Sequence, residues 1–513
     1  MRTLEQLTAW LTPRLRPLLL AGALGASSVA AASDADEARF NALQRQLAQV
    51  QAALQQLAGE NRALREHERE VDRKLAALAA VPQAGSPGPA LAQAAAAPSP
   101  AATPAAVAPV PGGLPNASAL PTAPAAPGNA LGGLGGLRLW GYGEIYYTDP
   151  TSARNQSQFD LARAVFGIGY AFDERTEFNS EYEVEHAVAS STDVGEFEVE
   201  QFYVDRRLNE AVSVRAGLFL MPFGFLNEHH EPINFYGMQR NFVETLIIPS
   251  TWREGGFNLH GDTAAGFGWN VGLTSGFDLS KWNFAPEFPP YSNALGLEDS
   301  DIAPLQASHQ ELALANGRYL SQYLALSYYG VPGLTLGGAI STGQAVPVPA
   351  PPNSVAPGTP RVTLWEAHAR WVPSRWDLSA IYARGTISNA ALANAANPGS
   401  PNPIPSAFYG YYVQGAYELW QRGDYRLNPF ARYEVYNMGA SYQGTSGPVP
   451  PIGEVPLSAA PGDYGLWPQN HDRVWTLGAN FYIGPHLVLK GDYQWYQQNV
   501  NFKRLDLGLG LAF

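Results

Sequence analysis

The feature that most constrains this chain is a regular alternation of apolar with small or polar residues, which begins near residue 137 and continues to residue 513. The segments "AVSVRAGLFL", "VWTLGANFYI" and "RLDLGLGLAF" each carry it over ten positions. A two-residue period places alternate side chains on opposite faces of an extended strand. We count sixteen such segments and predict strands that begin near residues 137, 159, 175, 195, 211, 254, 266, 316, 334, 361, 375, 408, 425, 472, 486 and 503.

The links between these segments alternate in length. Short turns fall at 173–174, 209–210, 262–265, 330–333, 373–374, 422–424 and 484–485. Between them lie longer links near 149–158, 188–194, 221–253, 277–315, 344–360, 388–407 and 442–471, and a shorter last one near 499–502. An up-and-down barrel in an outer membrane has short turns at one end and long loops at the other. A soluble sandwich has no reason to collect its long links at one end.

Closure of the sheet follows from the properties of lipid. In hydrocarbon every backbone N–H and C=O group must be paired within the protein, so a sheet that spans a membrane has to close on itself. A barrel of this size encloses an aqueous lumen, whereas one of about eight strands is filled by its own side chains. We therefore predict an all-β fold over residues 137–513, a sixteen-stranded antiparallel transmembrane β-barrel.

The first 32 residues have the pattern of a signal peptide. Arg2, Arg14 and Arg16 precede a short apolar run that ends in small residues near Ala30 to Ala32. No later stretch holds the roughly 18 consecutive apolar residues that a membrane helix needs. The absence of Cys excludes disulfides and thiol chemistry. We expect a protein exported to the outer membrane of a bacterium, with lipid around its barrel.

Residues 38–80 carry a heptad pattern and predict an α-helical coiled coil in the periplasm. Its a positions hold Phe40, Leu47, Leu54 and Leu75, and its d positions hold Leu43, Val50, Leu57, Leu64, Val71 and Leu78. A seam with a 3.5-residue period cannot be buried by one helix alone. Residues 81–136, rich in Ala, Pro and Gly, predict an extended linker. The alternative, a helix packed on its own globule, is disfavoured by this linker.

The third long link, residues 221–253, is unusually rich in apolar and aromatic residues. An apolar loop of this kind is unfavourable in water, so we predict that it folds inward against the lumen wall and narrows the pore. The candidates for the constriction are its charged and imidazole side chains: Glu228, His229, His230, Glu231, Arg240 and Arg253. Adjacent histidines rarely converge on one ion, so we expect pore lining or loop hydrogen bonds and no metal.

The alternation also predicts which charged side chains face the lumen. The basic candidates are Arg163, Arg215, Arg370, Arg432, Lys490 and Arg504. The same rule places Glu181 and Glu183 inside, together with Glu177, Glu185, Glu366, Glu434, Asp492 and Asp506, so acids match or outnumber bases. These residues could attract solutes, or they could form cross-strand ion pairs that satisfy one another, and the sequence leaves both interpretations open.

The final segment, "RLDLGLGLAF", is predicted to close the barrel against the strand near residue 137. Its Leu side chains would face lipid, while Arg504 and Asp506 face the lumen. No side chain projects from the inner face at Gly508 and Gly510, so we expect a neighbour or the inward loop to approach closely there.

The segment "VRAGLFLMPFGFLNEHHEPINFYG", with its Met-Pro-Phe-Gly break, resembles the phosphate-selective porin O and P family. The predicted coiled coil also resembles that of the trimeric dicarboxylate-channel porins. These resemblances imply a passive, homotrimeric outer-membrane channel for small hydrophilic solutes, including anions such as phosphate or dicarboxylates. They also imply that Phe513 is a terminal aromatic recognised by the barrel-assembly machinery. A row of basic residues typical of the family is not evident, because this region has only three Lys, at 281, 490 and 503.

Two other classes of function are alternatives to a channel. An enzyme barrel would need a nucleophile with its base, and neither a Gly-x-Ser-x-Gly motif nor a suitable histidine arrangement is present, so we predict no catalysis and no cofactor. A tether, with the coiled coil bound to the cell wall and the barrel as anchor, remains the alternative to a channel. The net charge of −13 without a basic patch argues against nucleic acid as a partner.

Overall fold

A computed structural model of the chain describes residues 136–152, 154, 157–189, 195–284, 303–349, 358–400, 402–445, 470–498 and 502–513. The predicted signal peptide and coiled coil, and all of the predicted linker except residue 136, lie outside the described residues. The described residues all belong to one compact unit.

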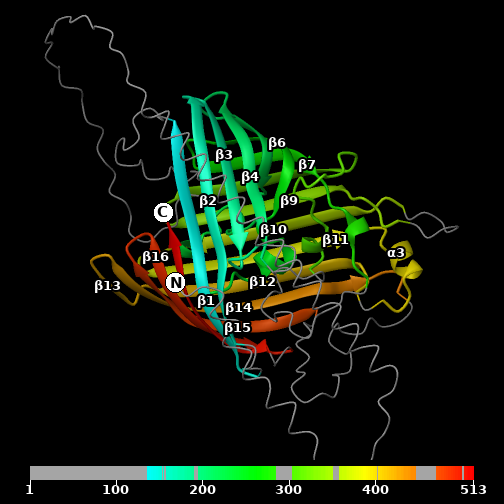
Figure 1. The fold of residues 1–513 in the computed structure, drawn as a ribbon. Helices are drawn as coiled ribbons and strands as arrows, with labels where there is room; N and C mark the ends of the chain where they lie inside the picture. Colours follow the sequence, from blue (N-terminus) through cyan, green and yellow to red (C-terminus); the bar gives the residue numbers. More distant parts are fainter. Residues whose placement is uncertain are drawn as a thin grey trace, which may run out of the picture. The chain divides into compact units, whose positions relative to one another are not determined.

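The structure is built almost entirely of β-strands that follow one another around a ring (Figure 1). The strands are β1 (Leu137–Pro150), β2 (Gln158–Asp173), β3 (Thr176–Glu185), β4 (Phe197–Arg207), β5 (Ser213–Leu220), β6 (Arg253–Asp262), β7 (Phe267–Ser275), β8 (Leu320–Val331), β9 (Leu334–Gln344), β10 (Arg361–Trp371), β11 (Trp376–Ile387), β12 (Pro405–Tyr417), β13 (Trp420–Arg422), β14 (Tyr425–Tyr442), β15 (His471–Ile483), β16 (Leu487–Tyr496) and β17 (Arg504–Ala512). The described helical turns are η2 (Pro232–Asn234), η3 (Val243–Ile247), η4 (Leu279–Lys281), η5 (Gln306–Ser308) and α3 (Ala391–Ala396).

Every strand pairs antiparallel with its neighbours, and β1 pairs with both β2 and β17, which closes the barrel. The three-residue β13 continues β12 after a short interruption, since both pair with β14. Seventeen strand segments therefore form sixteen barrel strands, as the alternation predicts. The predicted strand starts agree with the structure to within four residues, the largest difference being at β8, which begins at Leu320.

The strand links also alternate in length as predicted. The links between β2 and β3, and between β15 and β16, are tight turns at 174–175 and 484–486. The opposite end of the barrel carries long connections, of which the third spans residues 221–252. In Figure 1 this green segment after β5 lies across the inside of the ring.

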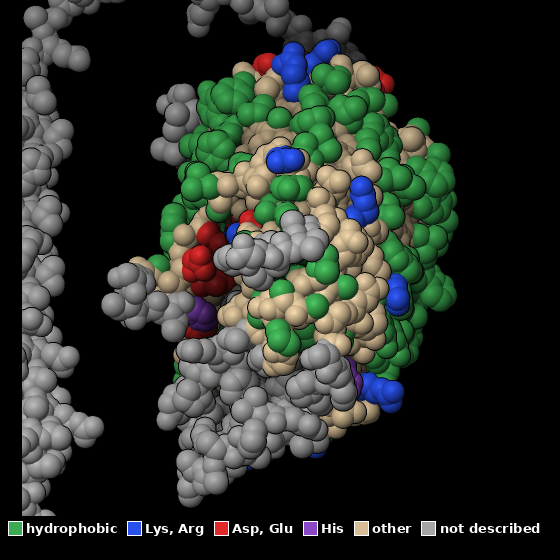
Figure 2. Space-filling model, turned by 90° about the vertical axis from the view of Figure 1, so that its right-hand side faces the viewer, with side chains coloured by type: hydrophobic (Ala, Val, Ile, Leu, Met, Phe, Trp, Pro, Cys, Tyr) green, Lys and Arg blue, Asp and Glu red, His purple; other side chains and the backbone are tan. Residues whose placement is uncertain are grey.

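Side chains on the outer face are apolar and exposed. Leu139, Phe159, Phe257 and Leu477 are examples, while their neighbours in sequence are turned inward. Figure 2 shows hydrophobic side chains over much of one described side of the surface, with Lys and Arg scattered among them. An apolar surface of this extent is stable against lipid and unfavourable in water. No described helix is long and apolar enough to span a membrane.

Aromatic side chains gather toward both ends of this outer face. Trp376 packs on Tyr417 with ring centroids 4.8 Å apart near the short turns. Tyr147 packs on Phe159 at 4.7 Å at the opposite end, near the first long loop. Rings of aromatic residues at both interfaces are typical of barrels that span an outer membrane.

The last strand, β17, makes the close approach that its glycines predict. A Cβ on Gly510 would lie 2.5 Å from Pro232 Cβ, and one on Gly508 would lie 2.3 Å from Met238 Sδ. Pro232 and Met238 both belong to the third loop. The prediction that the inward loop approaches Gly508 and Gly510 is confirmed, because only residues without a side chain leave room for it.

Candidate pore constriction and lumen wall

The two ends of the third loop are fastened to each other. Asn227 donates its Nδ2–H groups to the carbonyl oxygens of Met221, at 2.7 Å, and Trp252, at 2.8 Å. Its Oδ1 accepts from Trp252 N at 2.6 Å. Pro222 cannot continue the β5 ladder, and Gly224 has φ +69°, a left-handed conformation that favours glycine. The Met-Pro-Phe-Gly segment thus ends the strand and turns the chain into the lumen.

Inside the loop, Glu244 serves as an internal acceptor. Its carboxylate accepts hydrogen bonds from Phe225 N at 2.5 Å, Leu226 N at 2.8 Å and Asn241 Nδ2 at 2.6 Å. Burial raises the pKa of Glu244, while these donors act in the opposite direction. The apolar residues of the loop are buried around this carboxylate; they include Phe223, Phe242, Val243, Leu246, Ile247 and Ile248.

The loop is anchored to the wall on one half of the barrel. Its η3 packs on β11, β12 and β14, and its η2 packs on β1, β16 and β17. The backbone N–H groups of Gly237, Met238 and Phe242 donate to wall side chains, which are Asn480 at 3.2 Å, Asp492 at 2.6 Å and Glu434 at 2.8 Å. Buried polar groups in a protein interior require such partners, so these bonds fix the loop in position.

Arg432 on β14 is the centre of this anchorage. Its Nε donates to Glu434 Oε2 at 2.7 Å, and its Nη1 donates to the Tyr236 carbonyl oxygen at 3.0 Å. A third bond reaches the Gln239 carbonyl oxygen at 3.4 Å. The guanidinium therefore joins the wall to two points of the loop backbone.

All five predicted wall arginines lie inside the barrel and are paired with acids. Arg163 lies 3.1 Å from Glu144 and 3.6 Å from Glu183, and Arg215 lies 3.0 Å from Asp205. The remaining pairs are Arg370–Asp377 at 2.5 Å, Arg432–Glu434 at 2.7 Å and Arg504–Asp506 at 3.1 Å. Of the two interpretations left open by the sequence, the structure supports mutually satisfied ion pairs for these arginines.

Lys490 on β16 is held differently. Its Nζ lies 3.4 Å from the centre of the Phe235 ring, so the ammonium group is covered by the face of an aromatic side chain from the third loop. A cation over an aromatic face is stabilised by the ring quadrupole, most strongly when water is excluded. Lys490 is 4% exposed and is therefore also part of the loop anchorage.

An open cavity of about 740 Å³ remains on the other half of the lumen. Of the predicted constriction residues, Glu228, His229, His230 and Glu231 line it, and so do the wall residues Glu181 and Arg215. Burial raises the pKa of Glu228, and His229 and Arg215 partly oppose this shift. The remaining lining residues with acidic, basic or imidazole side chains are Arg138, Glu177, His260, Asp262, Glu366, His368 and His486.

Arg240 and Arg253 are not among the residues that line this cavity. Arg240 donates to Ser250 Oγ at 2.8 Å and Thr251 Oγ1 at 2.9 Å, within the third loop itself. Arg253 begins β6 and forms ion pairs with Glu198 and with Glu311, the latter at 2.8 Å. The structure thus separates the six candidate residues into a cavity-lining group of four and two arginines that hold loops.

Glu200 was missed by the sequence analysis. Strands β3 and β4 pair Glu181 with Gln201 and Tyr182 with Val199, so Glu200 is the extra residue of a β-bulge. The bulge turns Glu200 inward, where it is fully buried, although the alternation of β4 would place it on the lipid face. The two acids of "EVEQ", Glu198 and Glu200, stand two positions apart, and this spacing does not reveal a register shift.

Comparison with known proteins identifies a family for this chain. Residues 135–503 match the family described as phosphate-selective porin O and P. An uncharacterized protein of Aquifex aeolicus (strain VF5) is 27% identical over 367 residues, which cover 70% of this chain and 75% of that protein.

Among solved structures, Salmonella typhi OmpF in complex with daunomycin is similar with a TM-score of 0.45 and 12% identity, covering 74% of this chain and 97% of that one. An anion-selective porin from Comamonas acidovorans has a TM-score of 0.41 and 12% identity, covering 74% and 99%. The outer-membrane channel DcaP of Acinetobacter baumannii has a TM-score of 0.40 and 11% identity, covering 74% and 97%.

A closed sixteen-stranded barrel with an apolar outer face and a polar lumen defines an outer-membrane channel of the porin class. Because the family match extends over more than half of its length, this chain belongs to the phosphate-selective porin O and P family. The family suggested by the Met-Pro-Phe-Gly segment is confirmed.

Proposed function

We propose that this protein is a passive diffusion channel for small hydrophilic solutes, and that its third loop forms the constriction. The observation that carries the proposal is the division of the lumen. The loop is bonded to β11, β14, β15 and β16 on one side, while the cavity of about 740 Å³ is lined mainly by β1 and by β3 to β10, with Pro485, His486, Ala512 and Phe513 as further lining residues. Solutes would pass beside the loop, through the half of the lumen that it leaves open.

The charge of the described cavity lining favours cations over anions. Six carboxylates line it, those of Glu177, Glu181, Glu228, Glu231, Asp262 and Glu366, against the two guanidinium groups of Arg138 and Arg215. Both guanidinium groups are already paired, with Glu177 at 2.7 Å and with Asp205 at 3.0 Å. Ion selectivity follows the local field along the path, and here that field is negative.

The family description names phosphate, and one feature of the described residues favours an anion. Arg240 is 3% exposed, and its Nε and Nη2 have no hydrogen-bond partner among the described residues. A buried guanidinium with unused donors could hold an oxyanion. Phosphate or dicarboxylate passage is therefore the second candidate, and the two predict opposite ion preferences.

Replacement of residues 227–245 by a short Gly/Ser linker tests the constriction. We expect single-channel conductance in planar bilayers to rise by roughly two-fold or more, because the loop that occupies part of the lumen is removed. A difference in migration between the unheated and the heated variant on a denaturing gel would show that its barrel is folded. A folded variant with unchanged conductance and ion selectivity would contradict the proposal.

We further propose that the channel is a homotrimer, on the basis of the heptad pattern of residues 38–80 and the family resemblance. The unheated, detergent-folded protein should migrate as a trimer, and removal of residues 38–80 should weaken the assembly. Migration as a monomer before any such change would contradict this part of the proposal. The tether alternative depends on the same residues, and a folded barrel that is silent in bilayers would favour it.

A further inference from the structure

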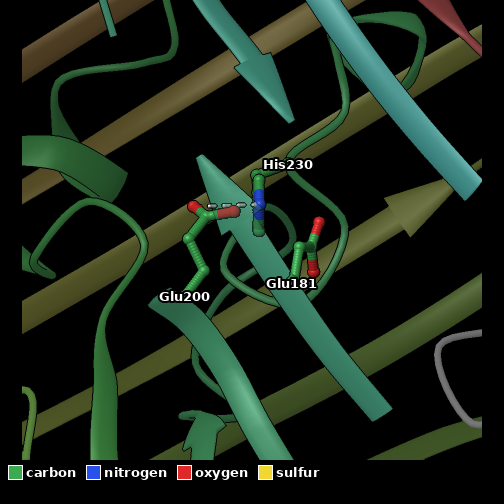
Figure 3. A group of neighbouring side chains, drawn as sticks. All are labelled: Glu181, Glu200 and His230. Atoms are coloured by element: carbon green, nitrogen blue, oxygen red, sulfur yellow. Dashed lines mark ion pairs between the residues drawn. The ribbon is translucent and has the colours of Figure 1, made fainter. Parts of the chain in front are cut away.

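Three buried side chains from three different segments meet at the edge of the cavity. They are His230 of the third loop, Glu181 of β3 and Glu200 of β4, and one ligand atom of each lies within 4.8 Å of the other two. Figure 3 shows the imidazole of His230 between the two carboxylates. The side chains are 4%, 4% and 0% exposed in that order.

The tautomer of His230 is set by a backbone carbonyl group. His230 Nδ1 lies 3.0 Å from the Asn227 carbonyl oxygen, which can only accept, so Nδ1 carries the proton. Nε2 then presents a lone pair, and it lies 3.7 Å from Glu200 Oε1.

Two acceptor atoms therefore face each other in a buried place. Within the part of the chain that the structure describes, neither His230 Nε2 nor Glu200 Oε1 has a hydrogen-bond partner. A buried acceptor without a donor costs about 1–3 kcal/mol, and the cost is larger for a charged group. A cation between the two atoms would remove this cost.

The neighbouring groups orient these ligands. Tyr142 donates its hydroxyl to Glu200 Oε2 at 3.3 Å, and its ring meets the edge of the His230 ring with centroids 5.5 Å apart. Gln201 donates to Glu181 Oε2. Each ligand thus has its second polar atom occupied, which is the arrangement that surrounds metal-binding histidines and carboxylates in proteins.

The charge around the cluster favours a divalent cation. Glu183 lies beside Glu200, and Glu231 adds a further negative charge near Glu181. Arg163, which carries a positive charge on the wall, is already bound to Glu144 and Glu183. The positive charge of Arg240 acts against a bound cation. The carboxylates of Glu181, Glu183, Glu200 and Glu231 outnumber it.

We propose that His230, Glu181 and Glu200 bind one divalent cation of the zinc class and so fasten the third loop to the lumen wall. One imidazole nitrogen with two carboxylate oxygens suits Zn²⁺ and similar ions, whereas Ca²⁺ and Mg²⁺ prefer oxygen alone. Ligand atoms of a tetrahedral zinc site lie roughly 3.4 Å apart, since the bonds are about 2.1 Å long. The His230–Glu200 distance of 3.7 Å is near this value.

The site depends on the β-bulge in β4. Without it, Glu200 would point to lipid, and the loop would face Glu181 alone. A register irregularity that brings a second acid beside the first is the kind of local change that re-aims a side chain at functional positions.

The test is a calorimetric titration of tag-free, chelator-treated full-length protein in detergent with zinc chloride. We expect one tight Zn²⁺ per chain, and a loss of affinity of roughly tenfold or more in His230→Gln and in Glu200→Gln. The matched control is His229→Gln, which changes the adjacent imidazole outside the cluster and should leave the affinity unchanged. Calcium and magnesium chloride should bind more weakly.

Absence of stoichiometric Zn²⁺ binding to the unaltered protein would overturn the proposal, and so would equal binding by all three variants. If the variants do not fold, the unaltered protein still decides, because Zn²⁺ should raise its thermal transition and Mg²⁺ should not. Conductance is measured separately in the presence of chelator, so failure of the zinc site and failure of the channel proposal are distinguishable.

Discussion

Arg432 and Glu434 on β14 lie under the third loop, whereas Glu181 on β3 and Glu366 on β10 face the open cavity. The first pair is buried in a 2.7 Å ion pair that also binds the loop backbone. The second pair lines a space of about 740 Å³ in which described carboxylates outnumber guanidinium groups. The same residue types therefore serve two purposes. Paired charges hold the loop on one half of the lumen, and unbalanced charges set the field in the other half.

The largest effect should come from a substitution that breaks the ion pair under the third loop. Arg432→Met leaves Glu434 as a buried charge without its partner and frees two loop carbonyl groups. Loss of one partner of a buried pair costs about 3–5 kcal/mol, so the loop should loosen and single-channel noise should increase.

The matched control for this variant is Arg422→Met in the exposed β13, which should change neither stability nor noise. The double variant Arg432→Met with Glu434→Gln should recover part of the loss, because the unpaired charge is removed. Equal behaviour of Arg432→Met and Arg422→Met would show that the pair does not hold the loop.

A second prediction concerns the effect of low pH on residues 303–312, which belong to the fourth long connection, between β7 and β8. Burial lowers the pKa of His309 to about 4, with Glu311 opposing this shift and Arg253 and Lys281 assisting it. Because the pKa of His309 in the folded state is below its unfolded value of about 6.5, the stabilisation that depends on a neutral His309 is fully present above pH 6.5. This stabilisation is lost as the pH falls toward 4. At pH 5 the loss should be about 2 kcal/mol.

Hydrogen exchange of residues 303–312, corrected for intrinsic rates, measures this loss. The unaltered protein should lose protection between pH 7 and pH 5, and His309→Gln should show a flat profile. The same acid response in both proteins would assign the effect to another group.

A third prediction tests the close contact between β17 and the loop. Gly510→Ala would place a Cβ 2.5 Å from Pro232 Cβ, in a proline ring that cannot rotate away. Overpacking of this kind costs about 1–3 kcal/mol, so the thermal transition should fall and the loop should shift. Gly415→Ala is the control, since its Cβ would meet Leu378 at 3.4 Å, an ordinary contact. Equal transitions for the two variants would mean that the loop does not depend on this contact.

The smallest effect on the folded channel is expected at Phe513. Phe513 is 72% exposed, and its backbone pairs with Gly141 through bonds of 2.8 and 3.0 Å that any residue could make. Phe513→Ala should therefore leave conductance unchanged and reduce the yield of assembled barrel in cells. Normal yield would remove the support for an assembly signal, and altered conductance would assign the ring a role in the pore.

The strands could be predicted because alternation and turn residues are local. The positions of β1, β9, β10 and β14 agree with the sequence to the first residue. Gly508 and Gly510 were informative for a similar reason, since a missing side chain on an inward face indicates a close neighbour.

The candidate site depended on information that is not local. Arg215 lies directly opposite Asp205, and a pairing of this kind requires the register of two strands. The role of Glu200 depends on one extra residue in β4, which reverses the face predicted by alternation. The partners of Arg240 and Arg253 depend on the path of the loops, which periodicity does not describe.

The reversal potential of single channels in a potassium chloride gradient tests the central claim most directly. If solutes pass through the acid-lined half of the lumen, the sign of the potential should report preference for potassium over chloride, and added phosphate should not reverse it. Preference for chloride or phosphate would contradict this account and would point to Arg240 as the group that governs passage.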